Sequence, residues 1–305
     1  MYLRHFGLAE PPFGLTPNTA FFLDQGPHRE ALNVLLVALR AGEGFLKITG
    51  EVGTGKTLLC RQLMRVLGDG FVTAYVPNPF INPNGLRLAL AEELGLKLPR
   101  NLGQHQVQAR LTERLLELAA DGTRVVLIID EAQAMPEDTL EAVRLLTNLE
   151  TERDKLLQVV LFGQPELDAR LALPQLRQLR QRVTFSYQLR PLSADMIAPY
   201  LQFRLHAAGY RGEWPFTEGA VRLLHHASRG VPRLVNILAH KSLLAAFGQG
   251  RHRVDAGHVR RAIADTDDAR RTARALPWRP LLGAGMVGVA GMTVLLALAW
   301  RWMSL

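Results

Sequence analysis

The chain has 305 residues, 48% hydrophobic and 21% charged, which excludes a disordered protein and indicates a globular one of about two domains. A single cysteine, Cys60, excludes an intramolecular disulfide and a cysteine zinc cluster and is compatible with a reducing cytoplasm. The formal net charge of +8 leaves three kinds of partner open: nucleic acid, an anionic membrane surface or an acidic protein.

The chain begins with an irregular arm, residues 1–26, in which prolines alternate with aromatic residues. The arm has no apolar core of a signal peptide, and we expect it to pack on the first domain. Over residues 27–41 apolar side chains recur at helical spacing, and Gly42 ends this predicted helix.

A short apolar run at residues 45–49 leads into the loop GEVGTGKT, and an apolar helical pattern follows. The loop matches G-x-x-x-x-G-K-[ST] in the strand–loop–helix setting of a nucleoside-triphosphate-binding P-loop, although a surface turn can have the same spelling. Glycines let successive N–H groups face one concavity, and the helix adds the positive end of its dipole. The predicted ATP-binding residues are Gly50, Glu51, Val52, Gly53, Thr54, Gly55, Lys56 and Thr57.

Two of these side chains carry specific expectations. Lys56 is expected to neutralise the β- and γ-phosphates, and the hydroxyl of Thr57 is expected to coordinate Mg²⁺.

Farther along the chain we predict a second strand at residues 71–76 and helices at 84–94 and 104–120. The run RVVLIID, residues 124–130, has the continuous apolar character of a central parallel strand that is buried on both faces.

Asp130 and Glu131 stand at the carboxyl end of this strand, where open parallel sheets bind their ligands. We expect Asp130 to help hold Mg²⁺ through water and Glu131 to orient or deprotonate the attacking water. An acidic cap of the next helix is the structural alternative.

A further buried strand at residues 156–162 ends at Gly163-Gln164-Pro165. Gln164 should therefore face the same edge as Asp130, where it could sense the γ-phosphate or position the water. An amide that only satisfies a turn is the alternative.

Three arginines, Arg177, Arg180 and Arg182, precede a fifth predicted strand at residues 183–189. An arginine that reaches the γ-phosphate bound by a neighbouring subunit would stabilise transition-state charge. Surface arginines are as common, so the three cannot all have this role.

Pro191 marks the start of a smaller helical part, with predicted helices at residues 193–208, 217–228, 231–247 and 255–265. Arg233, in the first turn of the third helix, could swing toward bound phosphate as this lid closes.

The C-terminal region differs in character from the rest. Residues 269–280 contain four arginines and no acid, and residues 281–300 contain no charged side chain. Twenty residues at ~1.5 Å each can cross a ~30 Å hydrocarbon core. The flanking arginines and Trp278, Trp300 and Trp302 favour a membrane helix over a buried core helix, with the preceding domains in the cytoplasm.

Six segments together resemble AAA+ ATPases, and within them the ExeA/GspA group of secretion ATPases: FGLAEPPFGLTPN, GEVGTGKTLLCRQL, IIDEAQAMPEDTLEAVRLLTNLET, LFGQPEL, LRQLRQRVTF and GVPRLVNILAHK. The resemblance covers residues 1–268 and is strongest to members that serve the mannose-sensitive haemagglutinin (MSHA) type IV pilus. It implies a five-stranded core with a lid, Mg²⁺-dependent ATP hydrolysis, nucleotide-dependent self-association, and membrane proteins of a pilus or secretion system as partners.

The resemblance also implies roles for single residues. Arg182 matches the AAA+ arginine finger, with Arg180 next, and Arg233 matches the second sensor in Gly-x-Pro-Arg. ExeA-like proteins carry a periplasmic peptidoglycan-binding domain after their membrane helix, and this sequence stops at Leu305, so we expect no direct peptidoglycan binding.

The sequence thus predicts an α/β fold with an AAA+ P-loop core and arm at residues 1–190, a helical lid at 191–268, a basic linker at 269–280, a transmembrane helix at 281–300 and a tail at 301–305. The predicted function is that of an ATPase anchored in the bacterial inner membrane. The alternatives are a DNA-binding AAA+ ATPase of the transposition or replication-loading kind, and a nucleotide-gated scaffold with negligible turnover. Arginines beside an apolar span make nucleic acid the less expected partner.

Overall fold

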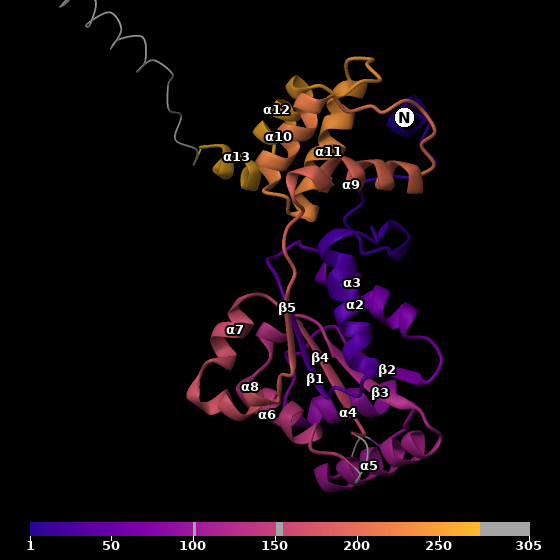
Figure 1. Cartoon of the computed structure of the whole chain (residues 1–305), viewed down its shortest axis with the longest axis vertical. Coiled ribbons are helices and arrows are strands. Elements are labelled where there is room, and N and C mark those ends of the chain that lie inside the picture. Colours follow the sequence, from indigo (N-terminus) through magenta and orange to yellow (C-terminus); the bar gives the residue numbers. More distant parts are fainter. Residues whose placement is uncertain (100–101, 151–154, 275–305) are drawn as a thin grey trace, which may run out of the picture.

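The computed structural model describes residues 1–99, 102–150 and 155–274. These residues form an α/β lobe and a smaller helical lobe (Figure 1). The predicted membrane helix at residues 281–300 and its three tryptophans lie outside the described residues. In the described part, no helix is both long and apolar enough to cross a membrane.

One five-stranded parallel sheet is the framework of the α/β lobe, as the sequence predicts. Its strand order is β2-β3-β4-β1-β5. The strands are β1 (Phe45–Thr49), β2 (Phe71–Val76), β3 (Arg124–Ile129), β4 (Gln158–Gly163) and β5 (Phe185–Gln188). The last is shorter than the predicted strand at 183–189.

The apolar run of β3 is buried on both faces of the sheet. Val126 and Ile128 belong to the hydrophobic cluster on one face, and Val125, Leu127 and Ile129 belong to the cluster on the other. Residues that alternate along a strand point to opposite faces, so a strand covered on both sides must be apolar throughout.

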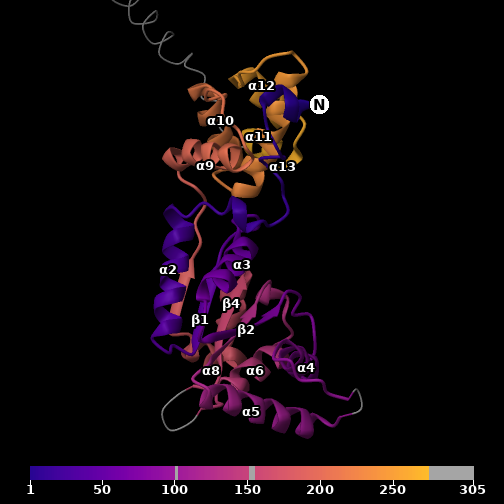
Figure 2. The ribbon, with the colours of Figure 1, turned by 90° about the vertical axis from the view of Figure 1, so that its right-hand side faces the viewer.

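Helices cover both faces of this sheet (Figure 2). The apolar residues of α2 (Gly26–Arg40) and α3 (Lys56–Leu67) fill one cluster. Those of α4 (Pro83–Glu93), α5 (Gln104–Ala120), α6 (Glu137–Leu146), α7 (Glu166–Leu171) and α8 (Arg177–Arg182) fill the other. Short 3-10 turns lie at η1 (Thr19–Phe21), η2 (Ala132–Ala134) and η3 (Pro174–Leu176).

The helical lobe, here called the lid, has helices close to the predicted ranges: α9 (Ala194–Ala207), α10 (Glu218–Ser228), α11 (Pro232–Phe247) and α12 (Ala256–Ala264). A further helix, α13 (Asp267–Arg274), occupies the start of the predicted basic linker. Ala269 is fully buried in the lid cluster, and Arg270 pairs with Asp267 one turn away, so this segment continues the lid.

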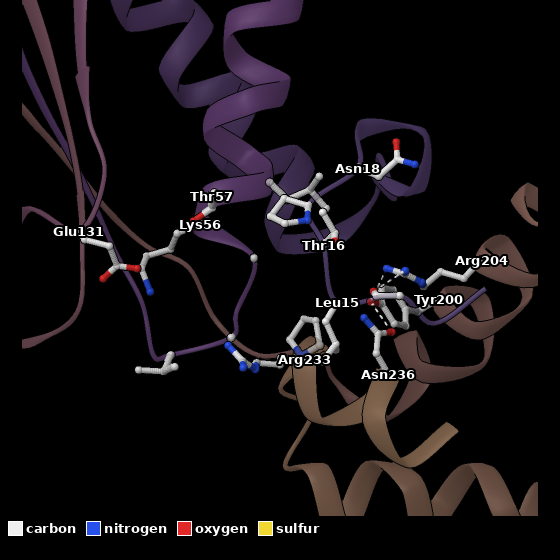
Figure 3. A pocket seen from close by; sticks show the side chains of 17 residues that line it. Leu15, Thr16, Asn18, Lys56, Thr57, Glu131, Tyr200, Arg204, Arg233 and Asn236 are labelled. Carbon is white, nitrogen blue, oxygen red and sulfur yellow. Dashed lines mark hydrogen bonds between the residues drawn. The ribbon is translucent and has the colours of Figure 1, made fainter. Parts of the chain in front are cut away.

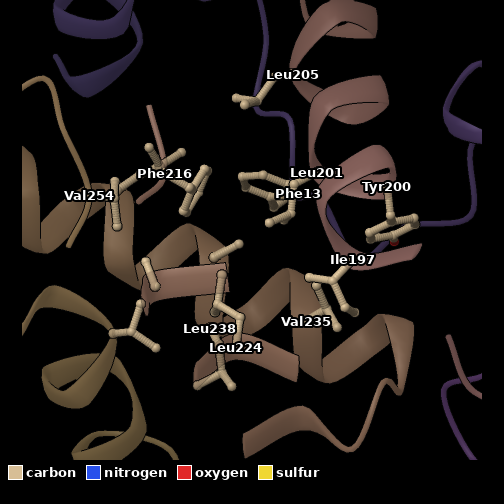
Figure 4. Close-up of a cluster of buried hydrophobic side chains, with 14 of the residues drawn as sticks. Phe13, Ile197, Tyr200, Leu201, Leu205, Phe216, Leu224, Val235, Leu238 and Val254 are labelled. Carbon is tan, nitrogen blue, oxygen red and sulfur yellow. The ribbon is translucent and has the colours of Figure 1, made fainter. Parts of the chain in front are cut away.

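The N-terminal arm packs mainly on the lid. The sequence-based division into domains groups the arm with the core, at residues 1–190. Helix α1 (Tyr2–Phe6) lies among the lid helices in both views (Figure 1 and Figure 2). Phe6, Leu8 and Phe13 join the lid cluster, and Phe13 lies beside Leu201 in Figure 4. The Ala9 amide donates to the Ala208 carbonyl at 2.9 Å. Phe6 and Phe13 of the arm thus complete the hydrophobic core of the lid.

Gly230, in the turn between α10 and α11, packs closely against the segment that leads from β5 into the lid. Its φ is +73°, and its carbonyl accepts a hydrogen bond from the Leu192 amide at 2.9 Å. A Cβ at this position would lie 2.0 Å from the Leu192 carbonyl oxygen. Backbone atoms cannot yield as a flexible side chain can.

We expect Gly230→Ala to lower the free energy of unfolding by more than about 2 kcal/mol, because it adds a backbone clash to an unfavourable φ. Urea denaturation followed by circular dichroism measures the change. Gly219→Ala, at a position within α10, is the control. A Cβ there would meet no atom closer than 3.9 Å, so stability should be unchanged or slightly raised. Equal stability of the two variants would contradict the prediction.

Candidate functional site

The P-loop, residues 50–57, connects β1 to α3 at the carboxyl edge of the sheet. Gly53 and Gly55 have φ of +80° and +99°, a backbone conformation that residues other than glycine adopt only at a cost in free energy. A Cβ on Gly55 would lie 2.8 Å from Nε2 of His28. The glycine spacing of the motif therefore fits both the curl of the loop and its contact with α2.

His28, which the sequence reasoning did not single out, supports the loop from α2. Its Nε2 donates to the carbonyl oxygen of Thr54 at 2.8 Å, and its ring packs edge-on against Phe22. Burial lowers the pKa of His28, although the bond to Thr54 opposes this shift. His28 is therefore a neutral hydrogen-bond donor that holds the P-loop against α2.

The side chain of Lys56 is folded over the loop. Its Nζ donates to the carbonyl oxygens of Gly50 at 2.7 Å and Glu51 at 3.0 Å, and the residue is only 5% exposed. Burial lowers the pKa of Lys56, while the carboxylates of Glu131 and Asp130 oppose that shift. A cation over a concavity of backbone amides matches a phosphate group in charge and shape.

Thr57 and Asp130 are brought together by the ends of α3 and β3. The Thr57 hydroxyl donates to Oδ2 of Asp130 at 2.6 Å, and Asp130 is 2% exposed. Burial raises the pKa of Asp130, and the hydrogen bond from Thr57 counteracts that rise. A hydroxyl beside a carboxylate is a donor set that Mg²⁺ uses together with phosphate oxygens and water, so these residues fit the ion.

Within the described residues, no three His, Cys, Asp or Glu side chains cluster to hold a metal by themselves. A magnesium ion at Thr57 and Asp130 would therefore take its remaining ligands from the nucleotide and from water.

Glu131 follows β3 with left-handed backbone angles, φ 52° and ψ 37°. Its Oε2 accepts hydrogen bonds from Nε2 of Gln133 at 2.6 Å and Nε2 of Gln164 at 3.1 Å. Burial raises the pKa of Glu131, but these two amides and Lys56 outweigh burial and leave it below its ordinary value. The carboxylate is thus charged, oriented and half-exposed at the cavity.

Gln133 is the second residue of this site that the sequence reasoning missed. Besides bonding Glu131, its Oε1 accepts a hydrogen bond from the Gln164 amide at 3.0 Å, and Arg170 donates to its carbonyl at 2.6 Å. The one available signal was its place two residues after Glu131, in the turn that leaves the strand. Gln133 therefore links the ends of β3 and β4.

A cavity extends from the P-loop to the lid and the arm (Figure 3). The lid reaches the P-loop at Arg233, whose amide donates to the Gly53 carbonyl at 3.1 Å. The contribution of the arm was not predicted. The lining from arm and lid consists of Gly14, Leu15, Thr16, Pro17, Asn18, Tyr200, Arg204, Pro232, Arg233 and Asn236.

The predicted finger arginines lie elsewhere on the α/β lobe. Arg177, Arg180 and Arg182 belong to α8, and none of them lines this cavity. Arg180 is exposed and Arg182 half-buried. Their role toward a neighbouring subunit stays a prediction.

The fold and the site are those of a P-loop nucleotide-binding protein of the AAA+ type, and residues 39–171 match the family model of the AAA domain. The chain is similar to general secretion pathway protein A from Aeromonas hydrophila. The two are 40% identical over 302 residues, which are 99% of this chain and 54% of that protein. The chain thus spans about half the length of this relative.

Solved structures share the fold at lower identity. Cdc6p from Pyrobaculum aerophilum superposes with a TM-score of 0.65 at 22% identity, over 83% of this chain and 70% of that one. The Aeropyrum pernix ORC1 protein, solved in complex with DNA, gives 0.62 at 23% identity, over 88% and 73%. At this identity the likeness concerns the fold alone.

We expect Gln133→Met to move the acidic limb of the pH–kcat profile to higher pH. Methionine keeps the length of the side chain and removes its amide, so the charged form of Glu131 loses a donor and its pKa rises. If Glu131 is the base that the sequence predicts, only its carboxylate form accepts the proton, and activity is then lost at a higher pH. Misorientation of Glu131 should also lower kcat roughly 10- to 100-fold.

Steady-state phosphate release across the acidic range measures both effects. Gln202→Met, an exposed position on α9, is the matched control and should behave as the wild type. A lower kcat with an unmoved acidic limb would show that Gln133 does not act through the charge of Glu131.

Proposed function

We propose that this protein binds Mg²⁺-ATP in the cavity between its lobes and hydrolyses it to assist assembly of a bacterial envelope machine. The observation that carries the catalytic part is the convergence of Lys56, the Thr57–Asp130 pair and Glu131 at one edge of the sheet. The homology to general secretion pathway protein A over 99% of this chain supports the envelope part.

The roles of the chain's own groups follow from their positions. Lys56 and the loop amides hold the β- and γ-phosphates. Thr57 and Asp130 hold Mg²⁺, which when bound neutralises charge on the phosphate oxygens. Glu131 takes a proton from the water that attacks the γ-phosphorus, and the bond to the bridging oxygen breaks to leave ADP and phosphate.

Three further groups complete the proposed site. Gln133 and Gln164 keep Glu131 charged and aimed at the water. Arg233 enters from the lid and brings a second cation toward the phosphates. The lid would thereby sense the state of the nucleotide.

Two substitutions test this site. Lys56→Ala should abolish nucleotide binding, because the buried cation is lost. Glu131→Gln should keep ATP affinity within a few-fold and lower kcat roughly 10²- to 10⁴-fold, because an amide cannot accept the proton. Binding of a fluorescent ATP analogue and phosphate release by the purified variants measure both, and unchanged hydrolysis by both would refute the site.

We further propose a cellular role, which includes self-association, a membrane anchor and protein partners. The protein would self-associate with bound nucleotide, with Arg182 or Arg180 of one subunit at the γ-phosphate of the next. It would be anchored in the inner membrane by residues 281–300 and act on membrane proteins of a type II secretion system or type IV pilus. The six sequence segments favour the MSHA pilus and a role like that of its ATPase MshM.

Carbonate extraction of membranes tests the anchor. We expect the full chain to stay in the pellet and a version ending at Arg274, after the last described helix, to become soluble, because residues 281–300 supply the apolar span. Immunoblots of both fractions show the outcome. If the full chain is also extracted, the anchor proposal is wrong.

DNA binding is the second candidate function, favoured by the net charge of +8 and by the fold shared with the ORC1 protein solved with DNA. Hydrolysis stimulated by duplex DNA, with a steep dependence on salt, would support this candidate over the envelope role. Nucleotide binding without turnover would instead support a scaffold.

A further inference from the structure

Arg204, on α9 of the lid, is a buried cation that binds the N-terminal arm. It is 5% exposed. Its Nε donates to the Pro12 carbonyl at 2.6 Å and its Nη2 to the Gly14 carbonyl at 3.1 Å. The guanidinium also lies 4.8 Å from the centre of the Phe21 ring. One lid side chain thus holds the arm through two backbone carbonyls and an aromatic face.

The same guanidinium is tied to a second lid helix. Its Nη1 donates to the Tyr200 hydroxyl at 3.2 Å, and that hydroxyl donates to Oδ1 of Asn236 on α11 at 2.9 Å. Asn236 stands one turn after Arg233, whose amide contacts the P-loop. The arm is therefore connected through Arg204 to the helix that approaches the phosphates.

The other end of the arm is held by the α/β lobe. Arg61, on α3, donates to the Pro17 carbonyl at 2.7 Å. Residues 14–18 thus cross from the lid to the α/β lobe, and all five line the cavity. Figure 3 shows Lys56 and Glu131 on one side of the cavity and Tyr200, Arg204 and Asn236 on the other.

We infer that residues 14–18 form a nucleotide-binding segment that the lid carries, and that Arg204 is the residue that positions it. The inference rests on the proposed binding of ATP. With the phosphates at Lys56, the nucleoside faces the arm and the Arg204 side of the cavity. Since Arg204 attaches the arm to the lid, this wall of the cavity moves with the lid.

The experiment uses the full chain with Arg204→Met, which keeps most of the side-chain length and removes the charge and all donors. Arg222→Met, at an exposed position on α10, is the matched control. We expect Arg204→Met to weaken binding of Mg²⁺-AMP-PNP, a non-hydrolysable ATP analogue, by roughly tenfold or more, with kcat at saturating ATP within about threefold of the wild type. Arg222→Met should leave both unchanged.

Hydrogen exchange gives a readout that a purely structural role would not move. AMP-PNP should slow exchange of the backbone amides of Gly14, Leu15, Thr16 and Asn18 in the wild type and in Arg222→Met, and not in Arg204→Met. Pro17 has no amide hydrogen. No slowing of these amides in the wild type, or wild-type affinity in a folded Arg204→Met, overturns the inference. If Arg204→Met does not fold, the wild-type exchange measurement decides by itself, and a lack of slowing by AMP-PNP overturns the inference.

Lys56→Ala separates this inference from the proposed function. If the wild type binds AMP-PNP, Lys56→Ala does not, and the Arg204 variants bind normally, only the inference fails. If the wild type does not bind AMP-PNP, or Lys56→Ala binds it equally well, the proposed function fails as well.

Discussion

The site depends on one constraint: a parallel sheet that is buried on both faces places the carboxyl ends of all its strands on the same edge. In the observed order, β1 lies beside β4, and β4 beside β3. The P-loop, Asp130–Glu131 and Gln164 follow these three strands, so segments that are far apart in the chain become neighbours. The apolar residues of β3 that bury the sheet therefore also assemble the polar site.

The carboxyl edge of the sheet holds two partly or fully buried carboxyl groups, and their hydrogen bonds oppose the effect of burial on their pKa. Burial alone would raise the pKa of both Asp130 and Glu131. Thr57 donates to the first, and Gln133 and Gln164 donate to the second, whose pKa ends below its ordinary value. The left-handed backbone of Glu131 adds local strain that the flanking contacts maintain. The Glu131 carboxylate is thus charged and oriented without a bound ligand, as the proposed general base requires.

The lid and the arm give the edge its second wall. Because Phe6, Phe13 and Phe21 are buried among the lid helices, most of the arm and the lid form one hydrophobic unit. Two connecting segments join this unit to the α/β lobe: one leads from the arm into α2, and the other leads from β5 into α9 (Figure 1). A ligand between the lobes would contact groups from both, so its binding free energy depends on how the lobes are held together.

The sequence by itself determined the P-loop, the buried strands and the lid helices, because glycine spacing, apolar runs and helical periodicity are local properties. It also indicated that Gln164 lies at the same edge of the sheet as Asp130, since both follow strands of one parallel sheet. The tertiary structure alone decided the roles of His28 and Gln133, and it placed the arm on the lid. The bond from Arg204 to Pro12 spans 192 positions, and no local pattern encodes such a contact. It arises only when both segments are buried together.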